Sequence, residues 1–245
     1  MANKTLTYDL SAPLGGATSA KVVVDTGTGN LTIDRHTGDE PLLASGTLEY
    51  VDKQGQPTQT LEMSNGQATL TLKGHGVGKA LFRLPWAACN GAFEWRIRLN
   101  PDIPCDITAH SSGGNVRLNL AGLAVTSLSA DTGGGNMDVV LPDNAADLSV
   151  TAKTGGGNVT VEIGSGTTGS NEVEAKSGAG NVTVRVPSGL AARVHATSGM
   201  GKVTVDPRFS KLDGNTYQSP DWDAAADRVE ITAGSGAGNV SVSTH

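Results

Sequence analysis

One short turn recurs along this chain and constrains its fold more than any other feature. The turn reads Thr154-Gly-Gly-Gly-Asn158, and each of its seven copies ends in Asn or, once, in Lys. The copies end at Asn30, Asn115, Asn136, Asn158, Asn181, Lys202 and Asn239. Between Asn115 and Lys202 the copies are 21, 22, 23 and 21 residues apart. A fixed period in this range is typical of a solenoid, in which each repeat stacks on its neighbours.

Apolar and polar residues alternate on both sides of each turn. Val150 and Ala152 precede the Asn158 turn, Val159 and Val161 follow it, and the residues between them are polar. This alternation predicts a strand before and a strand after the turn. One such unit cannot bury its apolar face alone, so we expect the units to stack. The sequence therefore predicts an all-β, right-handed parallel β-solenoid (β-helix) with coils of about 21–23 residues.

The column of Asn residues has two interpretations. It could form a ligand or metal rail along one edge of the solenoid. It could also be a structural ladder, in which stacked amides hydrogen-bond to one another and to the turn backbone. We favour the ladder, because neutral amides stack without the repulsion that a column of carboxylates would suffer. Lys202 interrupts the column once.

The period is lost between residue 42 and about residue 100. Residues 42–51, 58–64 and 68–73 each favour a strand, and Asn65-Gly66 is typical of a hairpin turn. We expect these strands to form an antiparallel meander inserted before the regular array. The predicted organisation is therefore an N-terminal coil plus antiparallel meander cap in residues 1–105, followed by the regular β-solenoid in residues 106–245.

Residues 206–227 form an insertion before the last repeat, and insertions in solenoids go to a loop on one face. The insertion holds Phe209, Tyr217 and Trp222, which either form a contact loop or fold back over the last coils as a lateral cover. The last copy ends the chain without a capping helix, so Val240 and Val242 are a candidate assembly edge, unless the insertion or another subunit covers it.

Composition excludes several classes of function. The net charge is −6 with no basic patch, so nucleic acid is not an expected partner. No His, Cys or carboxylate cluster has a catalytic or metal-ligating spacing, so we expect no catalytic residue, metal or cofactor. No apolar run is long enough to span a bilayer, and no signal-peptide pattern precedes the first strand. Cys89 and Cys105 could form a disulfide or remain free thiols.

Three stretches carry a resemblance to a known family. They are the recurring [Ser/Thr]-Gly-x-Gly-Asn-Val-x-Val motif, residues 14–33, and the segment from Trp95 to Ile107. With these stretches the chain resembles the toast-rack family, prokaryotic β-solenoid domains grouped with adhesin-like proteins and with the C-terminal domains of cell-wall-active antibiotics response proteins. The resemblance implies a non-enzymatic domain of the cell envelope or the extracellular space. Without a signal peptide, a cytoplasmic location stays open.

Three hypotheses of function follow. The first is a non-enzymatic structural and interaction domain of the prokaryotic cell envelope, adhesin-like or part of an envelope stress response. Its partner would be a protein, a second copy or a cell-surface glycan. The second is a self-assembling subunit that forms dimers or filaments through end-to-end stacking of coils. The third, a remote alternative, is a β-helix that binds or cleaves polysaccharide, which would require carboxylates clustered on one outward face.

Overall fold

The structure is a computed structural model that describes residues 4–52, 55–74 and 93–245. No α-helix occurs among these residues. The strands are β1 (Thr5–Pro13), β2 (Ser19–Asp25), β3 (Asn30–Arg35), β4 (Leu42–Val51), β5 (Thr58–Ser64), β6 (Gln67–Lys73), β7 (Glu94–Leu99), β8 (Cys105–Ser111), β9 (Val116–Asn119), β10 (Val125–Thr132), β11 (Met137–Val140), β12 (Ser149–Thr154), β13 (Val159–Glu162), β14 (Ser170–Ser177), β15 (Val182–Val186), β16 (Ala191–Ser198), β17 (Val203–Val205), β18 (Ser210–Asp213), β19 (Thr216–Gln218), β20 (Arg228–Ser235) and β21 (Val240–Thr244).

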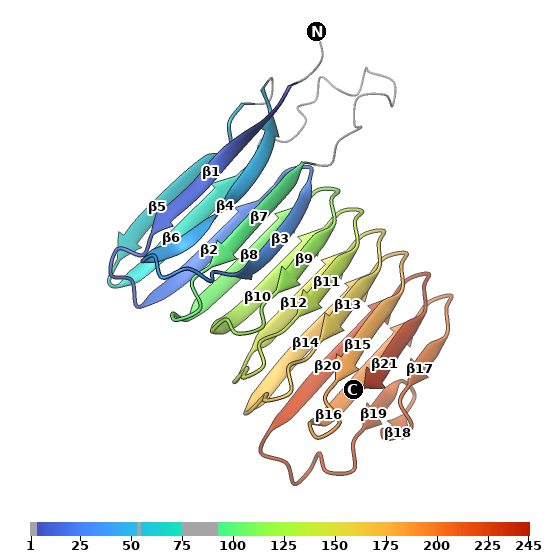
Figure 1. The fold of residues 1–245 in the computed structure, drawn as a ribbon. Coiled ribbons are helices and arrows are strands. Elements are labelled where there is room, and N and C mark those ends of the chain that lie inside the picture. Colours follow the sequence, from blue (N-terminus) through green and yellow to red (C-terminus); the bar gives the residue numbers. More distant parts are fainter. Residues whose placement is uncertain (1–3, 53–54, 75–92) are drawn as a thin grey trace, which may run out of the picture.

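The strands form two facing, mostly parallel sheets that together make an elongated rod (Figure 1). Sheet A has ten strands in the order β1-β4-β7-β3-β9-β11-β13-β15-β21-β17. Sheet B has eleven strands in the order β18-β19-β16-β20-β14-β12-β10-β8-β2-β6-β5. Each glycine turn connects a strand of sheet B to a strand of sheet A, so the repeated unit of the sequence supplies one strand to each layer. The architecture is an open, β-solenoid-like stack.

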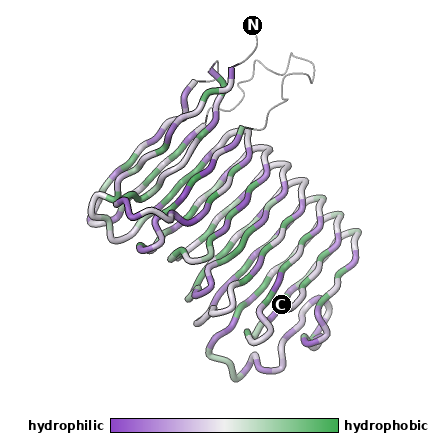
Figure 2. The backbone as a smooth tube through the Cα atoms, viewed as in Figure 1, coloured by the Kyte–Doolittle hydropathy of each residue, from purple (hydrophilic) through white to green (hydrophobic). Residues whose placement is uncertain are grey.

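The columns that the alternation predicts run across the strands of the two sheets, with one residue from each rung of the stack. Val150 pairs with Leu128 on one side and Val173 on the other, and all three point into the core. The alanine column beside it is completely buried where the two sheets meet at the turn. Apolar residues (green) alternate with polar ones (purple) along the strands in Figure 2, as expected when one face of each sheet is covered and the other is exposed.

The N-terminal end of the rod corrects one prediction. The three strands expected there exist as β4, β5 and β6, but they do not form one meander. β5 and β6 form a hairpin in sheet B, whereas β4 lies in sheet A between β1 and β7 and is antiparallel to both. The Asn65-Gly66 turn joins only β5 and β6, whereas β4 pairs with β1 and β7 in the other layer. The array continues past residue 105, because β2 pairs with β8 and β3 with β9, so the two predicted segments share one core.

The C-terminal end corrects a second prediction. The last repeat, β20 and β21, is not the end of the rod. β20 lies between β14 and β16, and β21 lies between β15 and β17, so the last repeat is inserted into the stack before the repeat that precedes it in sequence. The end of the rod is formed by β16 and β17, with the β18–β19 hairpin pairing to the free edge of β16. Residues 206–227 supply the chain that returns to the inserted position.

Candidate interaction surfaces

The predicted Asn positions run in one hydrogen-bonded column along the turn edge of the rod. The backbone N–H of Asn158 donates to the Asn136 side-chain oxygen at 2.9 Å, and Asn181 donates to Asn158 in the same way at 2.8 Å. The full column follows the stack, in the order Asn30, Asn115, Asn136, Asn158, Asn181, Asn239 and Lys202. Each oxygen that a metal rail would need accepts a bond from the next rung, which favours the structural interpretation of this column.

Lys202 is the last rung of this column rather than an interruption. Its backbone N–H donates to the Asn239 side-chain oxygen at 2.9 Å. A rung needs an acceptor side chain only when another rung follows it. Since no repeat stacks beyond Lys202, an ammonium group in place of an amide costs the column nothing. The one departure from Asn in the sequence therefore marks the end of the rod.

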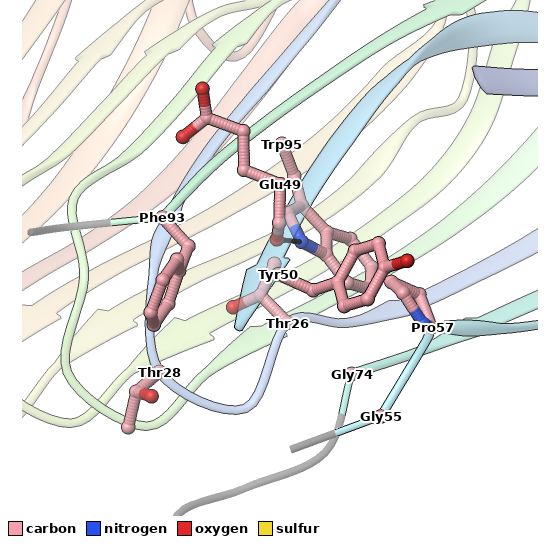
Figure 3. Close-up of a pocket in the computed structure, with 9 residues that line it drawn as sticks. All are labelled: Thr26, Thr28, Glu49, Tyr50, Gly55, Pro57, Gly74, Phe93 and Trp95. Carbon is pink, nitrogen blue, oxygen red and sulfur yellow. Dashed lines mark hydrogen bonds between the residues drawn. The ribbon is translucent and has the colours of Figure 1, made fainter. Parts of the chain in front are cut away.

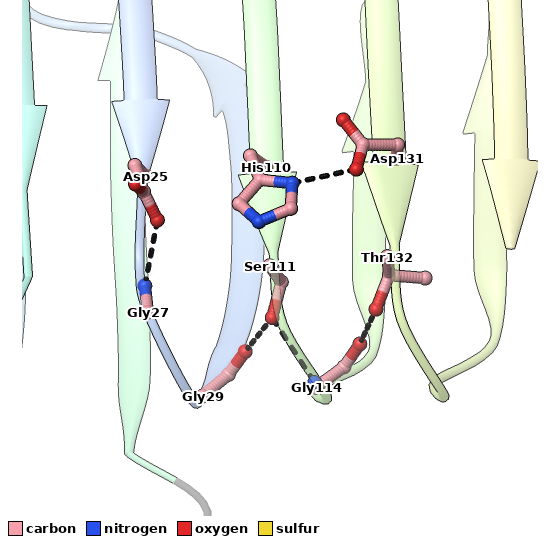
Figure 4. Close-up of polar contacts among 8 residues, drawn as sticks. All are labelled: Asp25, Gly27, Gly29, His110, Ser111, Gly114, Asp131 and Thr132. Atoms are coloured by element: carbon pink, nitrogen blue, oxygen red, sulfur yellow. Dashed lines mark hydrogen bonds and ion pairs between the residues drawn. The ribbon is translucent and has the colours of Figure 1, made fainter. Parts of the chain in front are cut away.

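Hydroxyl groups form a second column along the turns, and Figure 4 shows the contacts of Ser111 and Thr132 in it. The Ser111 hydroxyl donates to the Gly29 carbonyl at 2.9 Å and accepts from the Gly114 N–H at 3.0 Å. The Thr132 hydroxyl donates to the Gly114 carbonyl at 2.7 Å. The same contact recurs at every later turn, through Thr154, Ser177, Ser235 and Ser198. Turn-to-turn bonds of this kind fix the spacing of the rungs independently of the core.

The predicted contact loop does not present its aromatic rings to solvent. Phe209 and Trp222 are buried, and Tyr217 packs against the end of the core from β19. The guanidinium groups of Arg193 and Arg228 both lie over the Trp222 ring, at 4.7 and 5.6 Å from its centroid. The three rings therefore act as the lateral cover that was the alternative interpretation of the insertion, because stacking buries their faces against the last strands.

The predicted assembly edge is wrong. Val240 and Val242 are fully buried, since β21 is paired on both sides. At this end of the rod the edge strand of sheet A is β17, whose Val203 and Val205 are only partly covered. The prediction assumed that the repeats stack in the order of the sequence, but repeats of the same pattern can stack in another order. Two signals could have located the true end: Lys202 in the amide column, and the long insertion after it.

The outward faces carry polar residues in rungs. On sheet B, the Glu174 carboxylate lies 2.5 Å from the ammonium groups of both Lys153 and Lys176. Hydrogen bonds from these lysines hold the pKa of Glu174 below its usual value. On sheet A, four adjacent rungs present a strip of hydroxyl groups. This hydroxyl strip consists of Thr160, Thr183, Ser241 and Thr204.

The outward column that contains Asp25 and Asp131 does not cluster carboxylates. His110 lies between the two in the sheet, and its Nδ1 is 2.5 Å from the Asp131 carboxylate (Figure 4). Lys153 follows Asp131 on the next strand, so cationic or neutral groups separate the acids. Over residues 4–52, 55–74 and 93–245, no group of three or more His, Cys, Asp or Glu residues could hold a metal ion.

A shallow cavity lies beside Trp95 near the N-terminal end (Figure 3). The Trp95 Nε1–H donates to the Glu49 carbonyl at 3.0 Å, and the Glu49 carboxylate accepts from the Glu94 N–H at 3.1 Å. Glu49 is the sole carboxylate among the nine residues that line it. The polar groups of this cavity thus hold β4 against β7.

Cys105 lies between Ala20 and Val125 in sheet B and is buried as a small apolar residue. Burial raises the pKa of its thiol to about 12, so it is protonated at neutral pH. Cys89 lies outside the described residues, and the choice between a disulfide and two thiols stays a prediction. The part of the chain that the structure describes contains no helix long and apolar enough to cross a membrane.

Comparisons with known proteins place the chain among β-rich domains. The family described as the N-terminal domain of toast_rack, DUF2154, matches residues 1–162. No curated protein matches the chain. A solved structure of a candidate cell adhesion protein from Clostridium sporogenes ATCC 15579 is 21% identical, covers 100% of both chains and has a TM-score of 0.67, which shows a shared fold. A candidate adhesin from Bacteroides fragilis NCTC 9343 is 12% identical over 98% of this chain and 97% of its own, with a TM-score of 0.41.

Proposed function

Because this chain belongs to the toast-rack family, we propose that it is a non-enzymatic, adhesin-like structural and interaction domain of the prokaryotic cell envelope. The observation that carries the proposal is the rod itself. Its core is continuous, its turn edge is fixed by two hydrogen-bonded columns, and its outward faces are regular arrays of polar side chains. A fold of this kind presents a surface without needing a ligand for stability. The name of the solved Clostridium sporogenes relative supports adhesion as the role.

The hydroxyl strip on sheet A is the proposed contact surface. Thr160, Thr183, Ser241 and Thr204 stand on adjacent rungs, about 4.8 Å apart. On sheet B the comparable column of Thr108, Ser129 and Thr151 is shorter and ends at Glu174, whose carboxylate is paired with Lys153 and Lys176. Hydroxyl groups both donate and accept, which suits the hydroxyls of a cell-surface glycan. A protein partner is the alternative occupant, and the net charge of −6 does not favour nucleic acid.

Binding to purified bacterial cell walls tests this proposal. Beads coated with the protein should be retained on immobilised sacculi, and the Thr160→Glu, Thr183→Glu double variant should lose that retention. The matched control is Ser129→Glu, Thr151→Glu on the outward face of sheet B, which should bind like the unmodified protein. Retention lost equally in both double variants, or absent in the unmodified protein, would contradict a glycan contact on sheet A.

The finer features of the prediction are part of the same proposal. We expect a right-handed sense of winding, because connections between parallel strands of one sheet are overwhelmingly right-handed. We also expect one coil per 21–23 residues and a location at the cell envelope. An experimentally determined structure of the chain checks the first two. Digestion of intact cells with an added protease, followed by detection of the protein, checks the third.

A further inference from the structure

The C-terminal end of the rod has a step. The last rung consists of β16 and β17, and sheet B continues past it with two further strands, β19 and β18, while sheet A stops. Sheet A has no strand among the described residues opposite this hairpin. All four residues of β18 are accordingly exposed, and Tyr217 of β19 is only partly buried. The end is therefore recessed by two strands in sheet A and projects by two strands in sheet B.

Two strand edges border the step. β17 pairs with β21 and β18 pairs with β19, and in the described part of the chain each has a neighbour on one side only. On β17, the Lys202 carbonyl and the Asp206 N–H bond to β21. In a parallel pair alternate residues face opposite sides, so the backbone groups of Val203 and Val205 point away from β21. An edge of this kind is a template for another strand.

Large exposed hydrophobic side chains concentrate at this step. Of the three among the described residues, Met200 is 82% exposed in the last turn of the stack, and Leu212 is 55% exposed on β18. The other six glycine turns have Gly, Ala or Thr at the position of Met200. The core is also incompletely covered here, since Val203 and Val205 are partly exposed, whereas the valines of the neighbouring β21 are fully buried. Apolar surface gathered in this way marks an interaction site.

Two unpaired charges stand at the same step. Among the described residues, neither Lys202, just before β17, nor Asp213, at the end of β18, forms an ion pair. Residues 206–227 hold four other acids. Three of them lie in the segment that returns from β19 to the interior strand β20, where Trp222 contacts Arg228, and the fourth accepts a hydrogen bond from β21. Lys202 and Asp213 are therefore the opposite charges available for a contact at the step.

The strand directions at the step are fixed by the pairings. β16 and β17 run in opposite directions, because the glycine turn between them reverses the chain. β19 is antiparallel to β16, and β18 is antiparallel to β19, so β18 runs opposite to β17. A half-turn about an axis along the strands keeps these directions, reverses the stacking direction and exchanges the two layers. Applied to a second copy, this rotation lays its two-strand hairpin in the two-strand recess of the first.

We propose that two copies of this chain form a two-fold dimer at this end, in which β18 of each copy pairs antiparallel with β17 of the other. Both layers then run without a gap through the contact. Antiparallel pairing brings Lys202, at the start of β17, to the partner's Asp213, at the end of β18. It brings Met200 and Val203 to the partner's Leu212. The contact is made twice between the same surfaces, so it closes at two copies and does not continue into a filament.

The inward faces of the two hairpins also meet in this dimer. Tyr217 points inward, since it pairs with the buried Val194, and Lys211 lies on the same side, with its ammonium 5.7 Å from the Tyr217 ring centroid. The rotation keeps positions along the strands, so each ring faces the partner's Lys211 across the axis. The partly covered ring is buried there, and a cation beside an aromatic face is a favourable contact.

Light scattering after size exclusion, over a dilution series of the full chain, tests the dimer. The mass should reach twice 24.9 kDa at high concentration, fall to 24.9 kDa on dilution and never exceed the dimer. Lys202→Glu and Asp213→Lys should each dimerise at least about tenfold more weakly, because each brings like charges together twice. Both residues are exposed, so the fold itself should tolerate the changes. The matched control, Lys21→Glu on the outward face of β2, should dimerise normally.

Mixing the two charge variants supplies the decisive observation. Each contact of the mixed dimer again joins opposite charges, so dimers should return in the mixture. Leu212→Ser should also weaken the dimer, whereas Met63→Ser, at the other end of the rod, should not. A mass of 24.9 kDa at every concentration overturns the proposal, as do assemblies larger than a dimer, a mixture that stays monomeric, or a loss with Met63→Ser alone. Retention of a monomer on sacculi would leave the proposed function standing when the dimer fails, because the hydroxyl strip lies on the outward face.

Discussion

The middle of the rod and its C-terminal end are built from the same repeat, yet they relate differently to the order of the chain. From β8 to β15, neighbours in sequence are neighbours in the stack. At the C-terminal end the last repeat, β20 and β21, is inserted between two repeats that are consecutive in sequence. The repeat pattern fixes which residues share a column. It does not fix the order of the rungs, because every repeat offers the same backbone ladder on both edges.

The column of amides gives a physical reason for the observed order. Asn239 accepts from Lys202, and Asn181 accepts from Asn239, so every N–H in the column has an acceptor. If the repeats stacked in sequence order, the N–H of Asn239 would face the Lys202 side chain, which has no acceptor. The inserted order avoids that loss. The long connection through residues 206–227 makes the order accessible to the chain.

The largest loss of stability should come from placing a charge in β21, the strand that the sequence alone predicts to be the edge. Val242 is 1% exposed, so Val242→Asp buries a carboxylate without a partner and should lower the free energy of unfolding by about 4 kcal/mol or more. Val205→Asp, on the true edge, should cost about 1–2 kcal/mol, because water still reaches that side chain. Urea unfolding measures both. Equal losses in the two variants would mean that β21 is not an interior strand.

Substituting alanine for glycine in a turn should destabilise the fold where the next rung is close and have little effect where the turn is open to solvent. A Cβ at Gly157 would lie 2.1 Å from the Gly135 carbonyl oxygen of the preceding rung, whereas at Gly156 its nearest neighbour is the Gly134 Cα at 3.9 Å. We expect Gly157→Ala to cost about 2–3 kcal/mol and Gly156→Ala to stay within about 0.5 kcal/mol. Thermal unfolding followed by circular dichroism compares them. A tolerated Gly157→Ala would show that the rungs can separate without loss.

The sequence predicted the columns and the two-strand unit because both depend on local alternation and on a turn that repeats with small variations. Val150, Leu128 and Val173 share a column, as the alignment of the turns predicts. The sequence could not predict which strand stays at the edge, because any repeat can pair with any other through the same backbone hydrogen bonds. The aromatic rings of the insertion show the same limit. Phe209 and Trp222 are compatible with a contact loop or a cover until the position of the last repeat is known.

Removing a rung side chain should distinguish an interior amide from the terminal lysine. Asn158→Ala leaves the Asn181 N–H without its acceptor and should cost about 1 kcal/mol, since water replaces part of that bond. Lys202→Ala removes no acceptor from the column and should change stability by less than about 0.5 kcal/mol. Amide hydrogen exchange adds a local measurement, because protection should fall at Asn181 in the first variant. A comparable cost at Lys202 would place a further rung beyond it.

The smallest expected effect is the response of two carboxylates to acid and salt. Hydrogen bonds from Lys153 and then Lys176 lower the pKa of Glu174, while the Arg208 backbone N–H and then the Thr244 hydroxyl lower that of Asp206 at the end of the rod. A carboxyl with a lowered pKa binds fewer protons in the folded chain than in the unfolded one. Each carboxylate therefore stabilises the folded state at a pH above its ordinary pKa, which is 4.5 for Glu174. This stabilisation is lost as the pH falls through the lowered pKa of the folded state.

Glu174→Gln should flatten the rise of the free energy of unfolding between the acid range and pH 4.5, by less than about 1 kcal/mol for an ion pair near the surface. The two carboxylates should differ in how their effects on stability depend on salt. The charged partners of Glu174 are screened at high ionic strength, so the difference between Glu174→Gln and the unmodified chain should shrink there. The difference for Asp206→Asn should persist, because its first two donors are neutral. Equal salt sensitivity in the two variants would mean that the lysines of sheet B do not hold Glu174 in solution.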